Sequence, residues 1–173
     1  MSRVAITNAI QTYLTNQDIP DLANVYAYPQ KFTPEGEFYE GEDPGTSQGA
    51  MIFMRLGTQH ASRIELRGAT GGGKFVNYQL TLTIIYRSSK PKTQDAGADF
   101  DTFLDNLLAA IAASKTAGTN DGTVFSWGEG SDFGGEDFAL EVFYPRPINN
   151  QITQCNARLT LQILAQTTST ATD

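Results

Sequence analysis

Apolar and polar residues alternate along much of this chain with the period of two that is typical of β-strands. The longest such run covers residues 75–87, and its apolar positions are Val76, Tyr78, Leu80, Leu82, Ile84 and Tyr86. Residues 63–67 alternate in the same way, on the other side of a glycine-rich connection at residues 68–73. We predict that the two runs form a long antiparallel hairpin with one buried face.

Shorter runs predict the remaining strands. Residues 50–56 are almost continuously apolar, which is typical of a strand that is covered on both faces. Alternation toward the end of the chain predicts a second antiparallel pair, and Pro145 and Pro147 are expected to end the first of its strands. These additional predicted strands comprise residues 23–28, 50–56, 123–127, 137–144 and 152–165.

Two segments repeat apolar residues at steps of three and four, which is typical of amphipathic helices. The first covers residues 2–15, where Ser2 is available as the N-cap and the apolar face holds Ile6, Ile10, Tyr13 and Leu14. The second covers residues 99–114, and its apolar face holds Phe100, Phe103, Leu104, Leu107, Leu108 and Ile111. Alanines fill its other side, either to let a neighbour approach closely or simply because alanine favours helices.

The order of these elements predicts an α+β fold with a mixed, mainly antiparallel sheet around the long central hairpin, packed by an N-terminal helix and one central amphipathic helix. At 173 residues and 40% hydrophobic composition, the chain can bury one core. We therefore expect a single domain over residues 1–165, with a flexible tail over residues 166–173.

The composition excludes several kinds of chemistry. Cys155 and His60 are the single cysteine and histidine, so no disulfide, redox pair or zinc site is expected. No window approaches the roughly 18 apolar residues of a membrane span, and the N-terminus lacks a signal peptide. We predict a protein assembled in a cytoplasm, with no cofactor and no membrane contact.

One glycine-rich segment imitates a nucleotide-binding motif. Gly68-Ala-Thr-Gly-Gly-Gly-Lys74 matches the first part of a P-loop, but Phe75 stands where the motif needs a Ser or Thr to hold magnesium. A strand pattern follows instead of the helix whose N-terminus would face the phosphates. We interpret the segment as a hairpin tip that contacts a neighbouring molecule, and keep a nucleotide-binding enzyme only as an alternative.

No other side chains form a recognisable active site. Cys155 falls on the apolar face of its predicted strand, where a buried, inert thiol is expected. Acidic residues near Glu129 do not have the spacing of a calcium-binding loop. Trp127 is expected in the core or an interface, because no basic residues are interleaved with it. We predict no catalytic residue and no enzymatic activity.

Charge is distributed unevenly along the chain, whose net charge is −7. Residues 55–92 hold seven bases and one acid, whereas residues 121–141 hold six acids and no base. This polarity suits a subunit whose positive edge meets the negative edge of another copy, although two separately solvated faces would give the same pattern. The candidate contacts are Arg63, Arg67, Lys74 and Arg87 on the hairpin, and Glu129, Asp132 and Glu136 on the acidic loop.

A long segment over residues 29–48 has no apolar period and contains three prolines, three glycines and five acids. So long a stretch without secondary structure is unusual inside a compact domain and is typical of an arm or a binding loop. Phe38 and Tyr39 lie within it, and they either anchor a partner or fold back onto the core of the same chain.

The order of elements resembles the tail terminator family of long-tailed phages, the lambda-type proteins related to tail-to-head joining proteins. The resemblance is carried by the apolar run Gly49–Leu56, the alternating run Phe75–Arg87, the amphipathic segment Asp99–Leu108 and the closing run Arg158–Leu164. It covers about four-fifths of the chain, but the segments at 29–48 and 128–135 are longer than in the lambda-type pattern.

The resemblance implies a homo-oligomeric ring, usually a hexamer, in the virion at the head-tail junction. Such a ring caps the tail tube protein, ends its polymerisation and offers its other face to the head-side connector or stopper protein, with DNA only as passing cargo. A closed ring requires two different patches on each subunit, which agrees with the uneven charge. The alternative from the same assembly is a tail tube or head-tail connector (neck) subunit.

Overall fold

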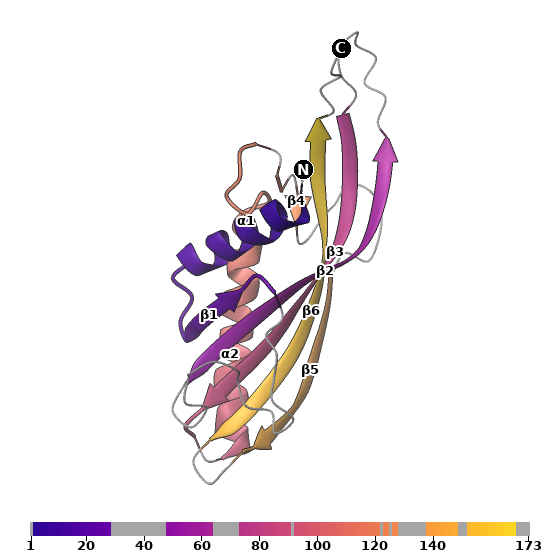
Figure 1. Ribbon diagram of the computed structural model, residues 1–173. Helices are drawn as coiled ribbons and strands as arrows, with labels where there is room; N and C mark the ends of the chain where they lie inside the picture. Colours follow the sequence, from indigo (N-terminus) through magenta and orange to yellow (C-terminus); the bar gives the residue numbers. More distant parts are fainter. Residues whose placement is uncertain are drawn as a thin grey trace.

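The chain folds as a twisted, mostly antiparallel sheet with two helices on one face, as the computed structural model shows (Figure 1). This arrangement confirms the predicted α+β class, including the N-terminal and central helices. The structure describes residues 2–28, 48–63, 73–90, 92–121, 123–124, 126–127, 138–148 and 152–168.

The elements follow the order that the hydrophobic pattern predicts. They are α1 (Arg3–Asn16), β1 (Leu22–Tyr26), β2 (Gly49–Arg63), β3 (Gly73–Ser88), α2 (Thr93–Ala112), β4 (Ser126–Trp127), β5 (Phe138–Pro147) and β6 (Thr153–Thr168). The strand order is β1-β2-β3-β6, and β6 pairs on its other side with β4 near its C-terminal end and with β5 along the rest. Among the strand pairs of the described residues, only β1–β2 is parallel.

The central hairpin is longer and more continuous than predicted. The pattern indicated separate strands at residues 50–56 and 63–67, but β2 is a single strand that pairs with β3 from Gly49 to Arg63. The register shifts between Leu56 and Gln59, so one irregularity interrupts the alternation without ending the strand. Residues 64–67 lie outside the described part.

Strand β6 also extends further than the sequence indicates. It pairs with β3 along its whole length and ends with Thr168 opposite Gly73, whereas the pattern placed the end of the strand at residue 165. Backbone pairing needs no apolar side chain, so polar residues continue a strand that already has a long partner. Figure 1 shows β2, β3 and β6 projecting together beyond the layer of helices.

One face of the sheet packs against both helices and forms the main core. Alternate residues of the three longest strands point toward this face, including Ile52, Leu82 and Leu159, and all three are fully buried. Helix α1 contributes Ile6, Ile10 and Leu14, and α2 contributes Phe100, Phe103, Leu104, Leu107 and Ile111. The apolar faces predicted for the two helices are therefore the faces that are buried.

Helix α1 begins as predicted. The side-chain oxygen of Ser2 accepts a hydrogen bond from the backbone N–H of Ala5 at 3.2 Å, which confirms Ser2 as the N-cap. Helix α2, in contrast, begins at Thr93 rather than at residue 99. Its first turn packs against the sheet through Ala96, which is fully buried and whose carbonyl lies 3.8 Å from the thiol of Cys155. Ala96 is one small apolar residue in an otherwise polar turn, so the sequence shows no apolar repeat that would predict a helix there.

The strands at the edge differ most from prediction. Strand β4 is only two residues long. The residues before it, Thr123 and Val124, are buried, and the chain turns there toward Thr119. The Thr119 hydroxyl lies 3.2 Å from the Val124 nitrogen. Strand β5 continues to Pro147 instead of ending before Pro145. Prolines are tolerated there because β5 has a strand neighbour on one side only within the described part of the chain.

The face of the sheet away from the helices holds a second, smaller cluster. Met51, Phe53 and Ile85 are buried there, and the ring of Tyr26 stacks on Phe53 with 5.2 Å between centroids. Further along this face the side chains are polar, and the ion pair between Arg158 and Glu141 spans 3.6 Å with both groups mostly exposed. A pair so exposed adds little stability.

Candidate interaction surfaces

The described residues contain no group of three or more histidine, cysteine or acidic side chains that could hold a metal ion. Cys155 is fully buried, which confirms the predicted environment, and burial raises the pKa of its thiol to about 11. A thiol with so high a pKa is almost entirely protonated at neutral pH and is a weak nucleophile. No helix within the described ranges is long and apolar enough to cross a membrane.

The structure separates the basic residues that the sequence singled out. Arg63 and Lys74 are backbone register partners at the end of the β2–β3 pair. Arg87 lies near the opposite end of β3, opposite Gln154 of β6. The hairpin therefore carries a basic pair at one end and a single arginine at the other.

Arg87 is only 3% exposed. Its Nε atom lies 3.4 Å from the side-chain oxygen of Gln154, and burial lowers the pKa of its guanidinium. Its role as a contact with another molecule stays a prediction. The other predicted contacts, Phe38, Tyr39, Arg67, Glu129, Asp132 and Glu136, lie outside the described residues, as does the segment that resembles a P-loop, apart from its last two residues.

An apolar surface that the sequence did not single out lies along strand β5. Four of the six exposed large apolar side chains in the described residues belong to β5 or follow it directly: Val142 (52% exposed), Phe143 (45%), Tyr144 (93%) and Ile148 (50%). We call these four residues the β5 edge. Large apolar side chains gathered on one strand are typical of a surface that another protein covers.

The centre of the β5 edge is shaped by an irregularity in the strand. The register with β6 shifts between Phe143 and Arg146, which turns Tyr144 away from the sheet. Arg146 is exposed beside it and takes part in no ion pair with the described residues. The edge therefore presents one projecting aromatic ring with a positive charge two residues away.

The opposite edge of the sheet, strand β1, is covered by its own chain. The side-chain amide of Gln11 on α1 donates a hydrogen bond to the Val25 carbonyl at 2.8 Å, and the Val25 N–H donates to the side chain of Asn24 at 2.8 Å. Before the strand, the Asp21 carbonyl accepts a hydrogen bond from the Ala50 N–H at 2.7 Å. The two bonds to Val25 occupy backbone groups that an incoming strand would need, whereas the bond from Ala50 ties the start of β1 to β2.

The segment after α2 is fixed against α1 by two aromatic side chains. The ring of Tyr13 meets the ring of Trp127 edge to face, with 5.5 Å between centroids, and the Tyr13 hydroxyl donates to the Ala110 carbonyl at 2.7 Å. The indole N–H of Trp127, which is buried as predicted, donates to the Ser114 carbonyl. Gly118 has a φ of +71°, a conformation that favours glycine, and lies close to the Tyr13 ring.

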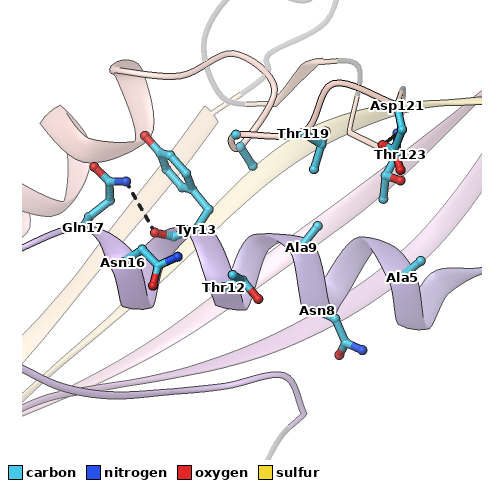
Figure 2. Close-up of a pocket in the computed structure, with 12 residues that line it drawn as sticks. Ala5, Asn8, Ala9, Thr12, Tyr13, Asn16, Gln17, Thr119, Asp121 and Thr123 are labelled. Atoms are coloured by element: carbon cyan, nitrogen blue, oxygen red, sulfur yellow. Dashed lines mark hydrogen bonds between the residues drawn. The ribbon is translucent and has the colours of Figure 1, made fainter.

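This packing leaves a groove between α1 and the segment formed by residues 117–121 and Thr123. The groove encloses about 640 Å³, and its lining residues are Ala5, Asn8, Ala9, Thr12, Tyr13, Asn16, Gln17, Ala117, Gly118, Thr119, Asp121 and Thr123. We call it the α1 groove. Figure 2 shows Ala5, Ala9 and Tyr13 pointing toward the segment that contains Thr119. The helix side chains next to this segment are mostly small, so they do not fill the space between the helix and the segment.

Asp121 is the single charged residue in this lining. Its carboxylate accepts a hydrogen bond from the backbone N–H of Thr123 at 2.9 Å. Hydrogen bonding to Thr123 lowers the pKa of Asp121, so the group stays negative well into the acid range. The groove thus combines a small apolar floor, several amide and hydroxyl groups, and one fixed negative charge.

Sequence reasoning missed both of these surfaces for identifiable reasons. Val142 and Tyr144 belong to an alternation that predicted a strand correctly, but the pattern does not reveal that the strand has a single neighbour. The groove depends on Ala5 and Ala9, whose small size carries no signal of its own in a helix. Neither Arg146 nor Asp121 stood out among the other charges.

Comparison with known proteins adds no family to this description. No protein-family model matches the chain, and no curated protein is similar to it at a significant level.

Proposed function

We propose that this protein is a non-enzymatic assembly subunit that forms a closed ring, acting as the tail terminator of a long-tailed phage. The observation that carries the proposal is the presence of two different open surfaces on one subunit, the β5 edge and the α1 groove. A ring with cyclic symmetry needs such a pair, because each copy must bind one neighbour with each of two patches.

The fold supports the same function. The order of helices and strands agrees with the order on which the resemblance to tail terminators rests, and the closing run Arg158–Leu164 lies in the last of the three described strands after α2. The projecting part of β2, β3 and β6 extends beyond the helices, where it could reach a tube or a connector. The described residues offer no constellation of nucleophile, base and charge that would support catalysis.

Electron microscopy of the purified full-length protein tests this function. Closed rings are expected, and added rings should bind the ends of isolated tail tubes and stop further growth of the tube. Open tubes formed by this protein alone would indicate a tail tube subunit instead. Rings that bind the head-side connector but leave tube growth unchanged would indicate a neck subunit. A chain that stays monomeric at every concentration would contradict all three roles.

A further inference from the structure

The β5 edge and the α1 groove lie on opposite sides of the same molecule. Helix α1 packs against β1 and β2, whereas β5 pairs with β6 at the other end of the strand order. Figure 1 shows β5 as the outermost strand at one edge of the sheet, and α1 in the helix layer above β1. A copy that offers its β5 edge to the groove of a second copy leaves its own groove open to a third, so the contact can continue around a ring.

The two surfaces are complementary in shape. Tyr144 projects with 93% of its surface exposed, and its half-exposed neighbours Val142 and Phe143 point to opposite faces of the sheet. The groove offers a space of about 640 Å³ beside the small side chains of Ala5 and Ala9. Tyrosine is a frequent anchor residue in protein interfaces because its ring is rigid and its hydroxyl still finds a hydrogen-bond partner when buried. Asn8, Thr12 and Asn16 along the groove can supply that partner.

The charges are complementary as well. Arg146 is exposed next to the projecting ring, and Asp121 is the charge in the groove. Opposite charges on the two halves of a contact favour one orientation and speed association. Because one surface carries the positive charge and the other the negative charge, the partner of each surface is best explained as a second copy of this chain.

We propose that the β5 edge of one copy binds the α1 groove of the next, with Tyr144 inserted beside Ala9 and Arg146 paired with Asp121. This contact rests on the proposed ring function and identifies the interface from which the ring is built. It is heterologous, because each copy contributes its β5 edge to one neighbour and its groove to the other.

Mixing two defective variants tests the proposal. The first, Tyr144→Ser with Arg146→Asp, loses the β5 edge and keeps the groove. The second, Ala9→Glu with Asp121→Arg, loses the groove and keeps the β5 edge. Each variant alone should be monomeric in analytical ultracentrifugation, and their mixture should form one-to-one dimers that grow no further. A symmetric contact between two β5 edges would instead let the second variant dimerise on its own, because that variant keeps its β5 edge, and this result would overturn the proposal.

A charge exchange tests the pairing of Arg146 with Asp121. Arg146→Asp alone and Asp121→Arg alone should each weaken self-association by about tenfold or more, and the double exchange should recover most of the loss. The matched control is Lys90→Asp with Asp99→Lys, an exchange of an ion pair at 2.8 Å whose residues belong to neither surface, which should leave assembly unchanged. Tyr28→Ser is the control for removing an exposed tyrosine.

The outcomes separate this contact from the proposed function. Rings that persist in both defective variants would overturn the contact and leave the terminator function standing. One-to-one dimers from the mixture, together with wild-type assemblies that fail to bind tail tubes, would support the contact and overturn the terminator function. Circular dichroism and thermal melting of each variant establish that the fold is intact, so a loss of assembly is not caused by unfolding.

Discussion

The two edges of the sheet differ in how their backbone groups are satisfied. At β1, α1 and the strand's own side chains occupy the outward groups, as the bond from Gln11 to the Val25 carbonyl shows. At β5, the described residues supply no second strand neighbour, and large apolar side chains are exposed there. Natural sheets usually protect their edges, so an edge that is left open and apolar points to a partner.

The difference between the two edges predicts that some residues determine the stability of the fold and others determine self-association. Residues behind the closed edge belong to the continuous core and should determine whether the chain folds. Residues on the open edge contact little of their own chain and should determine only whether copies associate. Substitutions at the two edges should therefore have effects that do not overlap.

The largest effect on stability is expected for Ile10→Ala on α1. Ile10 is fully buried behind the closed edge, and truncating such a side chain costs about 2–5 kcal/mol because it leaves a cavity. Urea denaturation followed by circular dichroism measures the change. The control, Val4→Ala on the same helix, truncates a side chain that is 52% exposed and should cost less than about 0.5 kcal/mol. Equal losses at the two positions would contradict the packing of α1.

The stability of the fold should depend on pH through Tyr86, a residue of β3 whose side chain reaches Asp21 just before β1. Its hydroxyl lies 3.4 Å from the carboxylate of Asp21, and burial together with the charges of Asp21 and Asp99 raises its pKa from 10.0 to about 12. The unfolded chain releases this proton near pH 10 and the folded chain only near pH 12. Stability that is fully present below pH 10 should therefore decline between these values.

Thermal melting between pH 9 and about 12 measures this decline. Tyr86→Phe removes the buried ionisation and should make the decline less steep, while the same substitution at Tyr144, whose ring packs on almost nothing, should not. A decline with the same slope in the Tyr86→Phe variant would show that another group is responsible.

A smaller effect is expected for Gln11→Met, which removes the donor that covers the Val25 carbonyl and keeps the shape of the side chain. The lost hydrogen bond should lower the free energy of unfolding by about 0.5–1.5 kcal/mol. The freed carbonyl should also make the β1 edge available to other strands, measured as increased non-specific aggregation in light scattering. Gln17→Met is the matched control, because its amide lies 3.5 Å from the Tyr13 carbonyl, at the limit of a hydrogen bond.

The smallest effect on stability is expected on the open edge. Tyr144→Ser removes a side chain that is 93% exposed, so the free energy of unfolding should change by less than about 0.5 kcal/mol. The same variant should have the largest effect on self-association. A substantial loss of stability would show that Tyr144 packs within its own chain and would remove the distinction between the two edges.

Most of the fold could be predicted from the sequence, whereas the candidate surfaces could not. The alternation around Leu80 and the helical spacing around Phe103 predicted the hairpin and the central helix, because each buried side leaves a repeating local signal. The start of α2 at Thr93 and the continuation of β5 past Pro145 left no such signal. Both depend on packing against strands that are distant in the sequence.

The sequence by itself determined the order of helices and strands and the buried side of both helices and of the central strands, because these properties depend on the spacing of neighbouring residues. Only the tertiary structure decided that β5 has a strand neighbour on one side. Val142 and Tyr144 are therefore exposed, although they alternate with polar residues as core residues do. The tertiary structure also decided that Ala9 borders a groove and that Arg146 and Asp121 lie on opposite sides of the molecule. These facts depend on long-range strand order, which local periodicity does not encode.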